Sequence, residues 1–155
     1  MENIYFRKAN FLDFFSLEKI VVDDRKTFDN PLFAKGDKPA YSTWFGLKSH
    51  LKLLAHLIHP KKQVLFVEIN SVIAGVSVCS ENLIEGFFVN KQFRGKGLGT
   101  KLMDYTITFI KKEKKFSSVK VGVQSSNALA KKFYEKMGFI KKESKGTEII
   151  FEKKL

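Results

Sequence analysis

The sequence predicts a single α/β domain with a mixed central sheet flanked by helices. Its 155 residues make one ordinary domain that is long enough to bury a core. Segments of helical and of strand periodicity alternate along the chain in the order β-α-α-β-β-β-α-β-α-β-β. The chain contains no internal repeat and no low-complexity linker. We therefore expect residues 1–155 to form one domain without an internal boundary.

The first 60 residues are expected to hold one strand and two helices. Alternating side chains predict a strand over Ile4 to Lys8, and Asn10 can cap a helix that begins directly after it. Residues 26–42 contain prolines and a glycine and are typical of a loop. Apolar residues at helical spacing predict a second helix over residues 43–59, and Pro60 ends it.

From residue 64 onward the pattern predicts most of the sheet. We expect strands over residues 64–69, 72–79 and 83–89, with a tight turn at Asn70-Ser71 between the first two. A glycine-rich turn then leads into a helix with one apolar side. The remaining predicted elements are a strand over 119–123, a helix over 127–137 that Gly138 ends, and closing strands over 139–142 and 147–153.

Composition limits the class of protein. The chain is 44% hydrophobic and 28% charged, which is globular composition and excludes an intrinsically disordered chain. The N-terminus lacks the features of a signal peptide, and no apolar run is long enough to span a bilayer, so we expect no membrane partner. A single cysteine, Cys79, excludes an internal disulfide and suggests a buried strand residue. We expect a cytoplasmic protein.

The formal net charge of +12 has two interpretations. A basic surface can bind nucleic acid or another polyanion. Alternatively, the lysines are a solvated surface, because they are dispersed along the whole chain and accompany no nucleic-acid-binding motif. We expect no nucleic-acid partner, and a polyanionic ligand would need only a local cluster of positive charge.

The glycine-rich turn over Gln92 to Thr100 is the first chemical feature. It follows a predicted strand and opens a predicted helix. Its glycines let backbone N–H groups approach a ligand, and the start of the helix adds unpaired N–H donors and the positive end of the helix dipole. The glycine spacing matches neither the P-loop nor the dinucleotide fingerprint. The turn therefore indicates either a phosphate-binding loop of another kind or a plain strand-to-helix connection.

Asn127 and Tyr134 form the second feature. They are seven positions apart, close to two helical turns, and so project from the same side of a helix. Each also has a purely structural interpretation. Asn127 can be a helix N-cap, and Tyr134 can be a core aromatic.

Together these segments resemble the GNAT superfamily of N-acetyltransferases. Gln92-x-x-Gly95-x-Gly97 resembles the pyrophosphate-binding motif of the family, and Glu85-Gly86-Phe87-Phe88-Val89 resembles its central strand. The segment from Asn127 to Phe139 is similar to the family's second motif, N-x-x-A-x-x-x-Y-x-x-x-G-F. The order of elements is also that of the family. The resemblance covers essentially the whole chain and is strongest from residue 64 onward.

The resemblance implies a GNAT-like domain that moves an acetyl group from acetyl-CoA to a primary amine, on a small molecule or a peptide, by direct attack. It implies that the backbone of Phe87, Phe88 and Val89 holds the pantetheine arm and the acetyl carbonyl, and that Asn127 contacts the same arm. The segment implied at the pyrophosphate comprises Arg94, Gly95, Lys96, Gly97, Leu98, Gly99 and Thr100. For Lys96 a solvated surface position is an equally open interpretation.

The resemblance also places Tyr134 near the sulfur, where its hydroxyl can protonate the departing thiolate. A backbone N–H near Val89 can stabilise the tetrahedral oxyanion. Glu85 is the nearest candidate for the base that takes the proton of the amine, acting through water. Its alternative interpretation is a salt-bridged or solvated strand carboxylate. This chemistry requires no metal.

Other residue clusters give weaker evidence of function. His56 and His59 are helical neighbours, but residues 42–63 contain no acidic residue or cysteine to complete a local metal site, so we expect none. Tyr41, Trp44 and Phe45 are either core residues or contacts for the acceptor.

Two other function classes stay open at this point. One is a catalytically weak module that binds or senses acyl-CoA, and the other is a polyanion-binding protein. A homodimer is compatible with the sequence. The net charge predicts a small neutral or zwitterionic amine as acceptor in preference to a polycation, unless the pocket is locally acidic.

Overall fold

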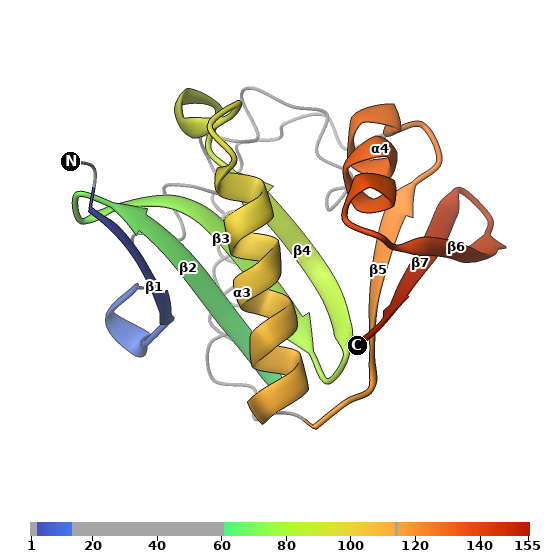
Figure 1. Cartoon of the computed structure of the whole chain (residues 1–155), viewed down its shortest axis with the longest axis horizontal. Helices are drawn as coiled ribbons and strands as arrows, with labels where there is room; N and C mark the ends of the chain where they lie inside the picture. Colours follow the sequence, from blue (N-terminus) through green and yellow to red (C-terminus); the bar gives the residue numbers. More distant parts are fainter. Residues whose placement is uncertain (1–2, 14–60, 114) are drawn as a thin grey trace, which may run out of the picture.

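The computed structural model describes residues 3–13, 61–113 and 115–155 (Figure 1). Seven strands in these ranges form one mixed sheet in the order β1-β2-β3-β4-β5-β7-β6. This arrangement confirms the predicted α/β fold. The strands are β1 (Ile4–Lys8), β2 (Lys62–Ile69), β3 (Val72–Ser80), β4 (Leu83–Val89), β5 (Ser118–Gln124), β6 (Ile140–Lys145) and β7 (Glu148–Lys154).

Strands β1 to β4 form a continuous antiparallel meander. β2 and β3 are joined by Asn70 and Ser71, whose φ angles are 49° and 64°. Positive φ at both central positions is typical of a two-residue hairpin turn that matches the twist of its strands. The tight turn predicted at these residues is therefore confirmed.

A β-bulge interrupts the pairing of β3 with β4. Val78 pairs with Gly86 and Cys79 pairs with Ile84, so Glu85 has no partner in the register. An extra residue in one strand reverses the alternation of its side chains. Ile84 and Phe87 consequently pack into the same hydrophobic core, although they are three positions apart, and Glu85 points to the other face of the sheet.

The second half of the sheet joins the first through a very short contact. β5 runs parallel to β4 and pairs with it only at Leu83↔Lys120 and Ile84↔Val121. β5 then pairs along its whole length with β7, and β7 pairs with β6. Beyond Ile84 and Val121 the two central strands diverge, and this divergence creates the site described below.

Two helices complete the described part of the domain. α3 (Leu98–Glu113) crosses one face of the sheet, and α4 (Ala128–Lys136) lies at the end of β5 (Figure 1). The predicted apolar side of α3 is buried against the sheet, with Leu102, Met103 and Ile110 fully inaccessible. Gly138 follows α4 with a φ of 81°, a conformation that glycine adopts without strain and that commonly ends a helix.

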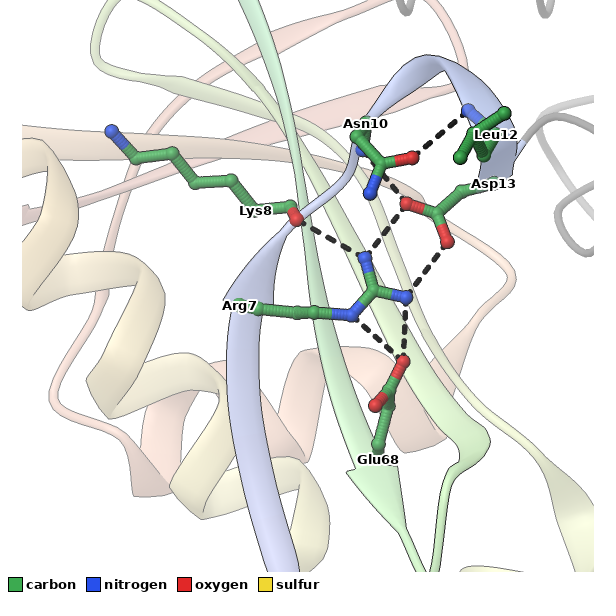
Figure 2. A network of polar contacts seen from close by, with 6 residues as sticks. All are labelled: Arg7, Lys8, Asn10, Leu12, Asp13 and Glu68. Carbon is green, nitrogen blue, oxygen red and sulfur yellow. Dashed lines mark hydrogen bonds and ion pairs between the residues drawn. The ribbon is translucent and has the colours of Figure 1, made fainter.

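An ionic network ties β1 to β2 and to the short 3-10 helix η1 (Phe11–Asp13) (Figure 2). The Arg7 guanidinium donates two hydrogen bonds of 2.7 Å to the two carboxylate oxygens of Asp13. It also donates two bonds, of 2.8 and 2.6 Å, to Oε1 of Glu68. The hydrogen bonds from Arg7 lower the pKa of Asp13. The Arg7 guanidinium carbon lies 5.0 Å from the centre of the Phe66 ring, so this cation contacts two carboxylates and an aromatic ring.

Most predicted elements after residue 60 are confirmed, with bounds that differ by no more than three residues from those expected. Cys79 is buried in β3, as predicted. The short 3-10 helix η2 (Lys91–Phe93), which Asn90 caps, was not predicted. The predicted helix ending at Pro60 and the loop before it lie outside the described residues. Among the helices that are described, none is long and apolar enough to cross a membrane.

Candidate active site

A cleft of about 530 Å³ opens where β4 and β5 diverge. Its walls are the second half of β4 and the second half of β5. The glycine-rich loop and the first turn of α3 close one end. Asn127, which precedes α4, Tyr134 on α4 and Glu148 at the start of β7 are further described residues of the lining. Motifs distant in the sequence therefore meet at one cavity.

The glycine-rich loop turns tightly at two positions. Gly95 and Gly97 have φ angles of 77° and 74°, which side chains rarely adopt, and a Cβ atom at either position would meet nothing within 4 Å. The space around both glycines is therefore open toward a ligand. Conformation, and not crowding, explains the requirement for glycine here.

The N-terminus of α3 supplies hydrogen-bond donors to the same end of the cleft. The helix begins at Leu98, and its first turn closes with a 3.2 Å hydrogen bond from the Lys101 N–H to the Gly97 carbonyl. The N–H groups of Leu98, Gly99 and Thr100 precede that turn and have no acceptor inside the helix. Such N–H groups and the positive end of the helix dipole are suited to binding an anion.

Arg94 holds the loop against the end of β4. Its Nε–H donates a 2.6 Å hydrogen bond to the Val89 carbonyl, and its guanidinium carbon lies 5.6 Å from the centre of the Phe88 ring. Arg94 also lines the cleft, as do its predicted partners Gly95, Gly97, Leu98, Gly99 and Thr100. Lys96, the remaining predicted residue of this segment, is not part of the cleft lining.

β4 presents an unpaired backbone edge to the cleft. Phe87, Phe88 and Val89 pair with β3 on one side, whereas β5 pairs with β4 no further than Ile84. In the described part of the chain no strand bonds the other edge of these three residues. An extended ligand can bond such an edge in the manner of an added strand.

Tyr134 lies in an aromatic cluster on the α3 side of the sheet. Its ring contacts those of Phe133, Phe139 and Phe151 at centroid distances of 5.5 to 6.2 Å, and 6% of the residue is exposed. Burial raises the pKa of its hydroxyl to about 12. Tyr134 lines the cleft, and its hydroxyl has no hydrogen-bond partner among the residues that the structure describes. It is therefore both a core aromatic and a protonated donor at the cavity.

Asn127 has the predicted N-cap role, and it also lies at the cleft. Its side-chain oxygen accepts a 3.0 Å hydrogen bond from the Ala130 N–H, so it is the N-cap of α4. It also lines the cleft. The cap uses the side-chain oxygen, and the amide nitrogen is the group that its chemistry leaves for a ligand.

Glu85 shows the salt-bridged arrangement that the sequence left open. Lys62 Nζ lies 2.5 Å from its Oε2, and the two side chains are 23% and 27% exposed, respectively. Lys62 is in phase with Val64 and Phe66 on β2, which belong to a cluster separate from the core under α3. Glu85 therefore lines the cleft from the face of the sheet opposite α3.

Glu148 is a charged cleft residue that we did not predict. Its side chain lies over Gly122 in β5, so closely that a Cβ atom at position 122 would collide with the carboxylate. A glycine in a strand interior indicates close approach of a neighbour, and Gly122 was visible in the sequence. Identifying the neighbour required the β5–β7 register, in which Gln124 pairs with Glu148.

Some predicted features cannot be placed. His56, His59 and the aromatic residues Tyr41, Trp44 and Phe45 lie outside the described residues. Over residues 3–13, 61–113 and 115–155, histidine, cysteine and acidic side chains form no group of three that could hold a metal ion.

Comparisons with known proteins identify the class to which this fold and cleft belong. The family model of the acetyltransferase (GNAT) domain matches residues 37–149. The chain therefore belongs to the GNAT acetyltransferase family. No curated protein matches the chain in sequence.

Solved structures agree with this assignment at the level of the fold. The PaiA N-acetyltransferase of Thermoplasma acidophilum, in complex with coenzyme A, superposes with a TM-score of 0.82 at 20% identity, covering 99% of both chains. A GNAT-family acetyltransferase from Streptococcus pneumoniae gives 0.71 at 18% identity, with 99% of this chain and 100% of that chain covered. The Campylobacter jejuni N-acetyltransferase PseH gives 0.67 at 18% identity and 97% of both chains.

Proposed function

We propose that this protein transfers the acetyl group of acetyl-CoA to a primary amine by direct attack. The observation that carries the proposal is the β4–β5 cleft, which has backbone N–H groups of the first turn of α3 at one end and, in its wall, the hydroxyl of Tyr134, to which no described residue hydrogen-bonds. A structural neighbour described as a coenzyme A complex supports the choice of acyl donor. The family assignment supports acetyl transfer as the reaction.

The residues present fit acetyl-CoA. The amides at the start of α3 and the two glycines with positive φ, Gly95 and Gly97, would bind the pyrophosphate. The unpaired edge of Phe87 to Val89 would hold the pantetheine arm. Arg94 already bonds the Val89 carbonyl, so we propose that it fixes the angle between the loop and β4, in addition to facing the phosphates.

Tyr134 would act on the leaving thiolate. With a pKa of about 12 its hydroxyl stays protonated at neutral pH and can donate a hydrogen bond as charge develops on sulfur. An ordinary thiol has a pKa of about 8.5, which alone would make full proton transfer unfavourable. The same apolar walls that raise the pKa of Tyr134 also disfavour a buried thiolate. They therefore raise the pKa of the thiol as well, which narrows the difference between the two pKa values.

Glu85 would receive the proton of the amine through water. Its ion pair with Lys62 holds the side chain in place at the cleft. The bulge directs this side chain to the face opposite α3, so the amine would approach from that face while Tyr134 acts from the other.

Gly97→Glu tests the donor site. A glutamate at this position has an unfavourable φ of 74° and places negative charge where the pyrophosphate would bind, so the variant should lose the rise in melting temperature that acetyl-CoA gives the wild type. Gly146→Glu is the matched control, because Gly146 also has positive φ (58°) and open space but lies in the β6–β7 turn. The control should keep the rise. Normal binding by Gly97→Glu would place the donor elsewhere.

Release of free thiol from acetyl-CoA in the presence of a panel of amines tests the reaction itself. We expect amine-dependent release by the wild-type protein. Binding of acetyl-CoA without release by any amine would favour the second function, an acyl-CoA-binding or sensing module.

A further inference from the structure

The described charged residues that line the cleft are mainly acidic, whereas the chain as a whole is basic. The net charge is +12, yet the charged residues that line the cleft are Glu85, Arg94 and Glu148. Arg94 belongs to the phosphate end, where it bonds Val89. Among the lining residues that the structure describes, those away from the glycine-rich loop therefore include two carboxylates and no cation.

Glu148 and Glu85 reach the cleft from the same face of the sheet. Val121 and Val123 pack into the core with Met103 of α3, so Gly122 between them faces the opposite side, and the Glu148 carboxylate lies against it. Glu85 is on that opposite side as well, because it pairs with Lys62. This is the face from which the amine approaches in the proposed reaction.

The two carboxylates differ in what already binds them. Glu85 holds the ammonium of Lys62. Glu148 makes no hydrogen bond or ion pair through its side chain with any residue that the structure describes. The Tyr134 hydroxyl in the same cleft is likewise unpartnered there, although its residue is 94% buried by the exposure of 6% given above. Glu148 is exposed and lines the cleft, so its carboxylate can bind a ligand without breaking an existing hydrogen bond or ion pair with a described residue.

Local charge dominates recognition inside the cleft. At physiological ionic strength, charges separated by more than about 8 Å of solvent are largely screened, so dispersed lysines contribute little to the selection of a bound acceptor. A carboxylate that touches the ligand contributes directly. The preference for neutral amines that net charge predicts should therefore be reversed in this pocket.

We propose that Glu148 is a specificity-determining residue that binds a second, non-reacting cationic group of the acceptor. The acceptor class is thus a diamine, with one amine directed to the thioester and the other to Glu148. This inference rests on the proposed acetyl transfer and narrows its acceptor.

The test compares 1,4-diaminobutane with 1-aminobutane, which lacks only the second amine, at saturating acetyl-CoA. The wild type should use the diamine with a kcat/KM about tenfold higher. Glu148→Gln should raise KM for the diamine about tenfold, leave its kcat nearly unchanged and leave 1-aminobutane unaffected. Glu143→Gln on β6 makes the same change in net charge outside the cleft lining and should alter neither substrate.

Melting temperature and acetyl-CoA binding of Glu148→Gln should match the wild type, which separates recognition from folding. An equal effect of Glu148→Gln on both amines, or no effect on either, would overturn the role of Glu148. A wild type that acetylates other amines but not the diamine would overturn the acceptor class. Absence of thiol release with every amine would instead remove the proposed function, and this inference with it.

Discussion

Tyr134 occupies the boundary between the hydrophobic core and the cleft, and its ring and hydroxyl serve different purposes. Three phenylalanine rings surround it and account for its burial. Removing the hydroxyl alone therefore separates chemistry from packing.

Tyr134→Phe should lower kcat by roughly ten- to a thousandfold while leaving acetyl-CoA affinity and folding nearly intact, because it removes only the proton donor. The measurement is a steady-state rate under conditions in which the chemical step limits turnover. Tyr105→Phe is the matched control, since Tyr105 is also partly buried with a raised pKa but packs on Phe6 away from the cleft. A wild-type kcat in Tyr134→Phe would restrict Tyr134 to a packing role.

The same residue predicts a change of stability at alkaline pH. Burial raises the pKa of Tyr134 from 10.0 to about 12, so between these values the unfolded chain releases a proton that the folded protein keeps. Stability is then lost as pH rises through this window, by about 1 kcal/mol from this group at pH 11. Urea unfolding at pH 9 and pH 11 should show a smaller loss in Tyr134→Phe than in the wild type. Equal losses would argue against burial of the hydroxyl.

Among single residues, the sequence correctly placed those whose position depends only on local spacing. Asn127 and Tyr134 share a helix side because helical periodicity places them there, and both line the cleft. Glu85 was identified, but its direction depends on a bulge that exists only in the pairing of β3 with β4. Glu148 depends on the register of β5 with β7 and could not be placed from local patterns.

At the scale of elements, two strand glycines have different roles. A Cβ atom on Gly75 in β3 would lie 2.9 Å from the Phe88 carbonyl oxygen, 3.0 Å from Val67 and 3.1 Å from Leu102. The obstacle includes backbone of β4, which cannot move without disturbing the cleft wall. On Gly122 the obstacle is only the end of the flexible Glu148 side chain.

Gly75→Ala should therefore destabilise the protein by about 1–3 kcal/mol through overpacking. Gly122→Ala is the paired comparison and should change stability by less than about 0.5 kcal/mol, because the Glu148 side chain can rotate away. Urea unfolding of the two variants beside the wild type measures both values. Equal destabilisation would show that the close contact at position 75 does not matter.

Element boundaries after residue 60 were predicted well, because these segments have clear periodicity. The alternation of Val119, Val121 and Val123 indicated β5, and all three are buried. The 3-10 helix η2 was missed because three residues are too few to establish a period. Its formation depends on the Asn90 side chain, which accepts a hydrogen bond from the Gln92 N–H.

At the scale of the whole molecule, the fold class followed from the order of elements, but the cleft did not. A strand order can be inferred from alternation and turn residues. The length of the β4–β5 contact cannot be inferred, because it depends on how two strands distant in the sequence pair, and these two share only Leu83↔Lys120 and Ile84↔Val121. Net charge is a property of the whole chain, and it could not show that Glu85 and Glu148 both line the cleft.

The two-pair contact between β4 and β5 has a consequence for cooperativity. The sheet consists of two blocks of paired strands, β1-β2-β3-β4 and β5-β7-β6. The blocks are joined only by the two β4–β5 residue pairs, Leu83↔Lys120 and Ile84↔Val121, which we call the seam. Regions with few shared hydrogen bonds open at lower free energy than the blocks beside them. A ligand that bonds the free edge of β4 would extend this seam, acting as part of the sheet.

Amide hydrogen exchange should therefore respond to acetyl-CoA at the seam before it responds elsewhere. At short exchange times, a peptide covering residues 85–90 should gain protection on binding. A peptide covering residues 64–69 of β2, which pairs with strands on both sides, should already be protected in the free protein. Uniform protection of both peptides would mean that the sheet opens as one block. A gain of protection confined to residues 85–90 would mean that bound acetyl-CoA stabilises the sheet in the way an added strand does.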